Sequence, residues 1–234
     1  MLFALGLGGE VVGDTVYCNY PPAAQKIAKI GDVNTSYEKV LALRPDLIVA
    51  DAVANSRAVQ RLKQLRQPIL SLRSTSLAGV ERSLTLLGLR TGTGGRAGQV
   101  VGEMERKVHL AENLAARDKR PPPHVLIVVQ TAPLWTAGAG TFLDDLVAHA
   151  GGVNVGHSVP GYGAISREQI LTNPPDVILG DATVQSSFDA DPILKRLPAV
   201  RRGRFYSLPA DLTSRPGPRL ADGLVLVAKA LHGN

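Results

Sequence analysis

Apolar residues recur every three to four positions between 91 and 120, which places them on one face of a predicted helix. The positions are Val101, Met104, Val108, Ala111 and Leu114 or Ala115. Thr91 or Thr93 can cap the start of this helix, and the prolines at 121–123 end it, because proline donates no backbone hydrogen bond. The pattern therefore predicts about 22 helical residues, over 96–117, with a length of roughly 33 Å.

Short apolar strands alternate with amphipathic helices before this long helix. Strands are expected at 11–13, 47–50 and 69–72, and helices at 2–7, 37–44, 56–67 and 76–88, the last ended by Gly88. This alternation is typical of a parallel sheet covered by helices on both faces. It resumes after the prolines, with a strand at 125–129, a loop at 130–140, a helix at 142–150, a loop at 151–164 and a final helix at 219–231.

A stretch of the second half repeats a stretch of the first. SREQILTNPPDVILGD at 166–181 aligns without a gap on SYEKVLALRPDLIVAD at 36–51, an offset of 130 residues. The identical pairs are Ser36/Ser166, Glu38/Glu168, Leu41/Leu171, Pro45/Pro175, Asp46/Asp176, Ile48/Ile178 and Asp51/Asp181. Convergence on a common helix-turn-strand pattern is one explanation, and two lobes of like construction is the favoured one.

The repeat on both sides of the long helix predicts the domain organisation. We expect an N-terminal α/β lobe at 1–90, a linking helix at 91–120 and a C-terminal α/β lobe at 121–234. Open α/β sheets bind ligands at the loops that follow their strands, so a ligand cleft is expected between the lobes.

Composition narrows the class of protein further. The 234 residues are 44% hydrophobic and 4% aromatic, and no window approaches the ~18 apolar residues of a membrane span. The net charge of +6 favours a solvated surface over an anion-binding patch, and no motif for nucleic-acid binding accompanies it. The opening MLFALGLGG lacks a basic leader and a cleavage site, so it does not read as a signal peptide.

The usual catalytic motifs do not occur in the sequence. The run GTGGRA at 92–97 fits a dinucleotide-binding pattern, but it follows a predicted helix instead of a strand. None of the five histidines is spaced like a metal-binding pair, and only His157 falls in a loop of the expected cleft. Asp51 and Asp181, equivalent in the repeat, remain a possible acid/base pair, although residues after a strand more often cap the next helix.

Several motifs resemble one family in order along the chain. TVYCNYPPAAQ with KIGD, EKVLALRPDLIVA, the long helix, SREQILTNPPDVIL and RPGPRLADGL are similar to the periplasmic binding proteins for cobalamin, haem and ferric siderophores. The motifs are most similar to those of the cobalamin binders. The resemblance implies a non-enzymatic, exported component of an ABC importer, periplasmic or on the cell surface, without a cofactor of its own.

The resemblance also implies a ligand and its contacts. A metal-containing ligand is expected, a corrinoid first and a ferric siderophore or haem second, delivered to a membrane permease by a monomeric protein that binds no nucleic acid. By matching position, the ligand-binding residues are Tyr17, Tyr20, Trp135, Tyr162 and Arg215. Val33 stands where a further aromatic residue is expected for cobalamin.

Two departures from the family pattern concern the N-terminus and the permease. Family members begin with an export signal and a first strand, and here the chain starts inside the helix that follows that strand. Family members also present a glutamate on each lobe to the permease, whereas the matching position of the second lobe is Ser214. Docking is therefore expected to use other acids, such as Glu81 or Asp222, or a permease with different charges. The rival interpretations are a cleft enzyme that uses Asp51 and Asp181, and a related fold that serves as a partner-binding surface protein.

Overall fold

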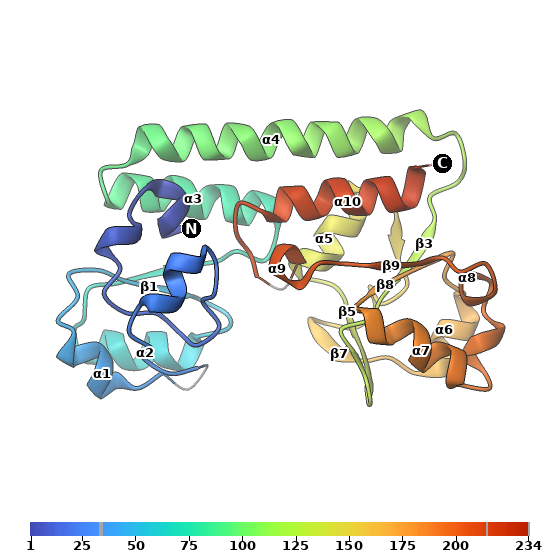
Figure 1. The fold of residues 1–234 in the computed structure, drawn as a ribbon, viewed down its shortest axis with the longest axis horizontal. Helices are drawn as coiled ribbons and strands as arrows, with labels where there is room; N and C mark the ends of the chain where they lie inside the picture. Colours follow the sequence, from blue (N-terminus) through green and yellow to red (C-terminus); the bar gives the residue numbers. More distant parts are fainter. Residues whose placement is uncertain (33–34, 214, 234) are drawn as a thin grey trace. The chain divides into compact units, whose positions relative to one another are not determined.

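The computed structural model describes residues 1–32, 35–213 and 215–233 of the chain (Figure 1). The chain forms two compact units, of which the first contains residues 1–74 and 78–101 and the second contains residues 75–77 and 102–234. Helix α4, Gly94–Arg117, begins in the first unit and ends in the second. Its observed bounds agree closely with the helix that the apolar spacing predicts, and Met104 and Ala111 of the predicted face are buried.

The first unit is built on a parallel pair of strands. Strand β1 pairs with β2 in a register that runs from Ile48↔Ile69 to Asp51↔Leu72. The elements in chain order are η1 Leu2–Leu5, η2 Gly8–Glu10, η3 Pro22–Lys26, α1 Tyr37–Ala42, β1 Ile48–Asp51, α2 Ser56–Gln64, β2 Ile69–Leu72 and α3 Leu77–Arg90. The core of this unit includes Leu62 on α2 and Leu84 on α3.

Two local predictions for this unit are wrong. Residues 11–13 form no strand, and only an isolated bridge between Asp14 and Lys29 forms nearby, because a strand requires a neighbour with which to hydrogen-bond. Helix α3 continues past Gly88 to Arg90. A Cβ on Gly88 would press on Ala97 at the start of α4, so this glycine permits close packing of two helices and does not end one.

The second unit contains two sheets. The order of the parallel sheet is β6-β3-β8-β9, and an antiparallel sheet of order β4-β5-β7 lies outside the predicted elements. The strands are β3 His124–Ile127, β4 Gln130–Thr131, β5 Leu134–Ala137, β6 Val153–Asn154, β7 Tyr162–Ala164, β8 Val177–Gly180 and β9 Phe205–Ser207. The helices are α5 Phe142–His149, α6 Arg167–Thr172, α7 Ala182–Ala190, η4 Leu194–Arg196, α8 Pro198–Arg201, α9 Ala210–Thr213 and α10 Leu220–His232.

The repeated sequence folds in the same way in both units. The Ser36 hydroxyl caps α1 by accepting from the Lys39 amide at 3.4 Å, and the Ser166 hydroxyl caps α6 by accepting from the Gln169 amide at 3.1 Å. The strands that follow pair alike, because β1 lies beside β2 as β8 lies beside β9. The α/β class with short, mainly parallel sheets is therefore confirmed, and the repeat has a structural basis.

An ion-pair cluster joins the end of α4 to the end of α10 within the second unit. The Asp118 carboxylate accepts from Arg120 Nη2 at 2.8 Å and lies 2.7 Å from His232 Nδ1, and His232 Nε2 lies 2.7 Å from the Ala150 carbonyl oxygen. The hydrogen bond from Arg120, followed by that from His232, holds the pKa of Asp118 well below its ordinary value.

This cluster predicts a pH-dependent contribution to stability. Because the folded-state pKa of Asp118 is depressed, its contribution is present above the ordinary value of 3.8 and is lost as the pH falls through the folded-state value. The stability difference between the parent protein and Asp118→Asn should therefore be larger near pH 7 than near pH 3. Urea unfolding at both pH values measures this difference, and equal differences would contradict the prediction.

Candidate functional site

Large aromatic side chains on the surface mark the candidate binding residues. The sequence has ten aromatic residues, one Trp, five Tyr and four Phe, and the structure describes all of them. Four are exposed, namely Tyr17, Tyr20, Trp135 and Tyr162, at 56%, 53%, 37% and 46%. These are the four aromatic residues expected to bind the ligand. Tyr17 and Tyr20 belong to the first unit, and Trp135 and Tyr162 belong to the second.

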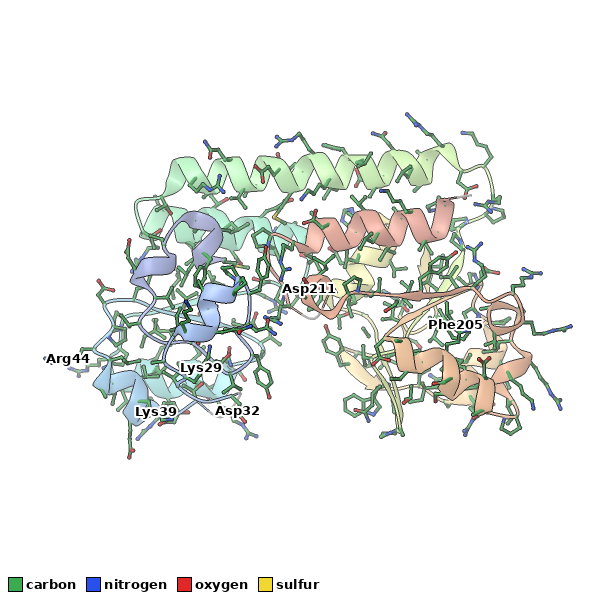
Figure 2. All side chains as sticks on the ribbon, in the orientation of Figure 1. Lys29, Asp32, Lys39, Arg44, Phe205 and Asp211 are labelled. Atoms are coloured by element: carbon green, nitrogen blue, oxygen red, sulfur yellow. The ribbon has the colours of Figure 1, made fainter. Side chains whose placement is uncertain are left out.

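The tyrosine loop, residues 17–22, is held in the first unit by one lysine. Lys29 Nζ donates to Asp14 Oδ1 at 2.6 Å, to the Cys18 carbonyl at 3.1 Å and to the Ala24 carbonyl at 2.9 Å. Figure 2 labels Lys29 among the side chains of this unit. All three donor positions of the ammonium are therefore occupied, and two of its acceptors lie within or beside the loop. The lysine fixes a segment that contains two prolines and has no ladder of its own.

Replacing Lys29 by methionine is expected to loosen the tyrosine loop. The change keeps most of the length of the side chain but leaves the Asp14 carboxylate, which is 9% exposed, without its cation. We expect a loss of about 1–3 kcal/mol in the free energy of unfolding. Lys26→Met is the matched control, since Lys26 is exposed on η3 and should change stability by less than about 0.5 kcal/mol. Chemical unfolding tests the pair, and equal effects of the two changes would refute the role of Lys29.

Trp135 and Tyr162 lie on one face of the antiparallel sheet in the second unit. Trp135 on β5 pairs with Ala164 on β7, and Ala137 pairs with Tyr162, so the two aromatic residues are two positions apart along adjacent strands. We call this pair the aromatic face. The sequence pattern predicted loops for both residues, and this prediction is wrong. Strands this short, with Pro133 between β4 and β5, show little alternation of apolar and polar residues.

Tyr162 is packed as well as exposed. Its ring meets the ring of Phe142 edge-on, with the centroids 6.4 Å apart. Burial raises the pKa of Tyr162 to about 12, so its hydroxyl is neutral at physiological pH. A neutral phenol on a fixed ring can stack on a flat ligand and also donate a hydrogen bond.

A polar network around Asn154, the last residue of β6, supports the aromatic face. Asn154 Nδ2 donates to the Ala137 carbonyl and to Asp144 Oδ1, both at 2.8 Å, and Asn154 Oδ1 accepts from the Gly156 amide at 2.9 Å. His157 Nδ1 lies 3.1 Å from both oxygens of Asp144. Of these residues only His157 stands out in the sequence, because Asn154 lies in a predicted loop and Asp144 in a predicted helix, where nothing marks their side chains as partners.

The other residues singled out from the sequence are Arg215, Val33, Ser214, Asp222 and Glu81. Arg215 is half-buried in the bend before α10, in the second unit. Val33 and Ser214 lie outside the described residues. Asp222, an alternative docking residue, forms an ion pair of 2.5 Å with Lys107, whereas Glu81 is half-buried on α3.

Both acids of the enzyme hypothesis act as local caps. Asp51 Oδ1 accepts from the amides of Val53 and Ala54 at 2.8 and 2.7 Å. Asp181 caps α7, and the hydrogen bond from the Thr183 hydroxyl holds its pKa below the ordinary value. A general acid or base requires a pKa near the operating pH, so the structure gives no support to this hypothesis. The described residues contain no group of three or more His, Cys, Asp or Glu that could hold a metal ion.

The fold and these residues define the class of two-unit α/β ligand-binding proteins. The chain belongs to the periplasmic binding protein family, whose model matches residues 1–212. Family members are transport components and not enzymes. No described helix combines the length and the apolar character that crossing a membrane requires.

Relatives agree with this assignment along nearly the whole chain. The chain is 28% identical over 237 residues to an uncharacterized ABC transporter substrate-binding lipoprotein of Bacillus subtilis, covering 98% of this chain and 76% of the relative. It resembles the periplasmic vitamin B12-binding protein of Vibrio cholerae, with 25% identity, a TM-score of 0.86, and coverage of 98% and 91%. It also resembles the apo periplasmic haem-binding protein of Roseiflexus sp. RS-1, with 26% identity, a TM-score of 0.86, and coverage of 99% and 93%.

Proposed function

We propose that this chain is an exported receptor that captures a large metal-containing ligand and delivers it to the permease of an ABC importer. A corrinoid is the first candidate, and a ferric siderophore or haem is the second. Family membership supports the transport role, and similarity to proteins named for vitamin B12 and haem supports the ligand class. The protein needs no cofactor of its own for this function, and it acts as a monomer without catalysing a reaction.

The exposure of the four aromatic residues is the observation that carries the proposal. The other six aromatic residues of the chain are buried or half-buried, so exposure is confined to the tyrosine loop and the aromatic face. Exposed aromatic rings on fixed supports provide flat apolar surfaces for corrin, porphyrin or siderophore groups. Arg215 is proposed as the partner of an anionic group of the ligand.

Titration with candidate ligands tests the proposal. Cyanocobalamin, haemin, a hydroxamate siderophore and a catecholate siderophore are added in turn, and the fluorescence of the single tryptophan and the thermal midpoint are followed. Binding should quench Trp135 and raise the midpoint for one ligand class. If all four leave both signals unchanged, the ligand proposal fails, although the family assignment stands.

Removing one aromatic side chain should weaken binding measurably. For the ligand that binds, Tyr17→Ala and Trp135→Ala should each cost about 1 kcal/mol or more, which is at least a fivefold loss of affinity. Isothermal titration measures both variants, since Trp135→Ala removes the fluorophore. Leu89→Ala is the control, because Leu89 is a 76% exposed apolar residue on α3 outside the proposed site. If Tyr17→Ala and Trp135→Ala weaken binding no more than Leu89→Ala does, the ligand does not bind to these two aromatic residues.

Two measurements distinguish the rival functions, namely the turnover of a substrate and the response to the four ligands. A cleft enzyme would convert a substrate and lose that activity in Asp181→Asn, whereas the receptor shows no turnover. A partner-binding surface protein would retain its interaction in Tyr17→Ala and would respond to none of the four ligands.

A further inference from the structure

The second unit carries a group of basic side chains next to β9. Residues 192–210 contain five basic residues and no acidic residue. The five lie on η4, on α8 and on the turn between α8 and β9 (Figure 1). We call them the basic surface, which consists of Lys195, Arg196, Arg201, Arg202 and Arg204. All of them are exposed except Arg204, which is half-buried.

Apolar residues between these basic residues fix the surface to the core of the second unit. Leu194, Leu197 and Ala199 are exposed by 5%, 2% and 0%, and they belong to the buried cluster that contains Phe188. Helix η4 contacts α7, and α8 contacts both α7 and β8. After α8 the backbone stays attached, because the Arg204 amide donates to the Ala199 carbonyl at 2.8 Å. The basic side chains are therefore displayed from a fixed backbone.

The exposed charge of the basic surface is not neutralised within the protein. Its four exposed side chains form no ion pair within the part of the chain that the structure describes. The two acids that flank residues 192–210 are themselves paired, Asp191 with Arg167 and Asp211 with Arg219, at 2.6 Å each. This concentration of one sign of charge is suited to an anionic partner.

An exposed apolar residue lies beside the basic surface. Ile193 is 44% exposed, and the Asp191 carboxylate holds its backbone by accepting from the Ile193 amide at 2.9 Å. The Arg196 amide donates to the Ile193 carbonyl at 3.1 Å, so the two residues are one 3₁₀ turn apart and lie on the same side of η4. Basic and apolar side chains that share one side match the boundary between lipid headgroups and acyl chains.

We propose that the basic surface docks the protein onto the anionic headgroups of a phospholipid bilayer. Arginine pairs with phosphate oxygens in a bidentate geometry, and Ile193 enters the headgroup region beside it. A bilayer fits better than a nucleic acid, because residues 192–210 expose no aromatic side chain on which a base could stack. The contact goes beyond the receptor function, since it keeps the protein at the membrane whether or not an importer ligand is bound.

Vesicle sedimentation tests the proposal. The full chain is mixed, without importer ligand or permease, with vesicles of phosphatidylcholine and phosphatidylglycerol and with vesicles of phosphatidylcholine alone. It should bind the anionic vesicles, and it should bind the neutral vesicles at least about tenfold more weakly. Salt at about 1 M, where the Debye length is about 3 Å, should release it from the anionic vesicles. Because no importer ligand takes part, failure of this test leaves the proposed receptor function untouched.

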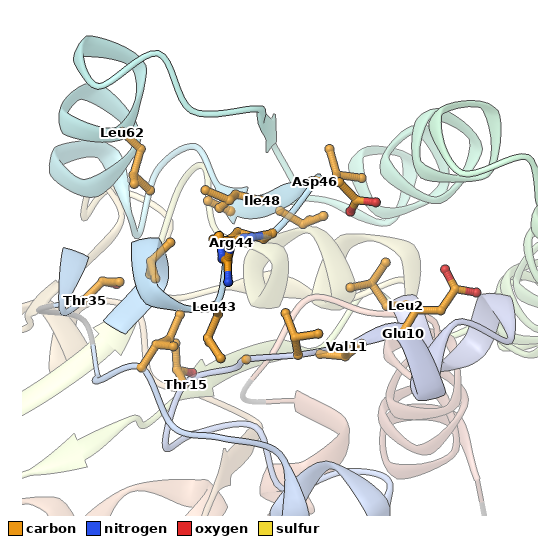
Figure 3. A pocket seen from close by; sticks show the side chains of 18 of the residues that line it. Leu2, Glu10, Val11, Thr15, Thr35, Leu43, Arg44, Asp46, Ile48 and Leu62 are labelled. Atoms are coloured by element: carbon orange, nitrogen blue, oxygen red, sulfur yellow. The ribbon is translucent and has the colours of Figure 1, made fainter. Parts of the chain in front are cut away.

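Charge reversal locates the contact. Arg201→Glu combined with Arg202→Glu should weaken binding to the anionic vesicles by about tenfold or more. The control combines Lys39→Glu with Arg44→Glu, which changes the net charge equally at two exposed residues of the first unit. Figure 2 labels both control residues, and Figure 3 shows Arg44 at an apolar groove of that unit. This control should bind as the parent does.

Two further changes separate the apolar contact from the charge. Ile193→Ser should weaken binding about fivefold at constant charge, because less apolar surface enters the bilayer. Leu89→Ser, at a 76% exposed position on α3, should have no effect. Lys195→Gln combined with Arg196→Gln removes charge from the same surface without reversal and should weaken binding by about tenfold. Circular dichroism verifies that each variant is folded.

Three outcomes would overturn the proposal. Absence of binding to the anionic vesicles would show that the basic surface takes no bilayer. Equal losses in the Arg201 and Arg202 variant and in the first-unit control would show that binding follows net charge. Binding of a DNA duplex as tight as that of the vesicles, with no effect of Ile193→Ser on either, would identify a general polyanion surface instead.

Discussion

Gly138→Ala is expected to destabilise the second unit by about 3 kcal/mol or more and to abolish ligand binding. A Cβ on Gly138 would collide with the carbonyl oxygens of Val159 and Gly156, which are backbone atoms that no side-chain rotation can move away. The same residue donates its amide to the Gly161 carbonyl at 2.8 Å, and its own carbonyl accepts from the Thr141 hydroxyl at 2.8 Å. Gly138 thus ties the end of β5 to the cap of α5 and to the loop before Tyr162.

The control for this change is a glycine with open space around it. Gly98 lies inside α4, and a Cβ there would meet no atom within 4 Å. Gly98→Ala should stabilise the protein by about 0.5–1 kcal/mol, because alanine favours the helix more than glycine does. Chemical unfolding and ligand titration of both variants test the contrast. Wild-type affinity in Gly138→Ala would show that the aromatic face does not depend on this close approach.

Phe188→Ala is expected to cost about 3–5 kcal/mol of stability, through lost burial and the cavity left behind. Phe188 on α7 is 1% exposed and belongs to a buried cluster with Leu126, Ile170 and Ile178. Its ring meets that of Phe205, labelled in Figure 2, edge-on, with the centroids 6.0 Å apart. The change therefore removes one of the largest fully buried side chains of the chain from its contact with Phe205 on β9.

An exposed leucine on the neighbouring helix provides the control. Leu171 on α6 is 49% exposed, so Leu171→Ala should change the free energy of unfolding by less than about 1 kcal/mol. Urea unfolding monitored by circular dichroism compares the two variants with the parent. Similar midpoints for both would mean that the cluster around Phe188 repacks without a cavity.

Local patterns predicted the regular elements well. Apolar spacing and the prolines at 121–123 placed α4 to within a few residues, and the strand at 69–72 matches β2. These signals are strong because a helix or strand that buries one face repeats its apolar residues at a fixed period. The antiparallel sheet was not predicted from the sequence, because β4 has two residues and β7 has three, which is too short for an alternating apolar pattern.

The candidate binding residues were reached by resemblance and not by spacing. Tyr17, Tyr20, Trp135 and Tyr162 follow from matching motifs, and the structure adds that these are the exposed aromatic residues of the described chain. Their supports were not predictable. Lys29 bonds to atoms 5, 11 and 15 positions away, and Asn154 reaches Ala137 at a distance of 17 positions, so no local pattern records these contacts.

Local sequence patterns were enough to predict the long helix, the parallel strands at 47–50, 69–72 and 125–129, and the repeat that relates the two units. These features depend on neighbours a few residues apart, which the chain specifies directly. Tertiary packing was needed to establish which aromatic rings remain exposed, how the tyrosine loop and the aromatic face are held, and that β1 is partly exposed where β8 is buried. Burial and strand pairing depend on contacts between distant segments, and those are settled when the chain packs.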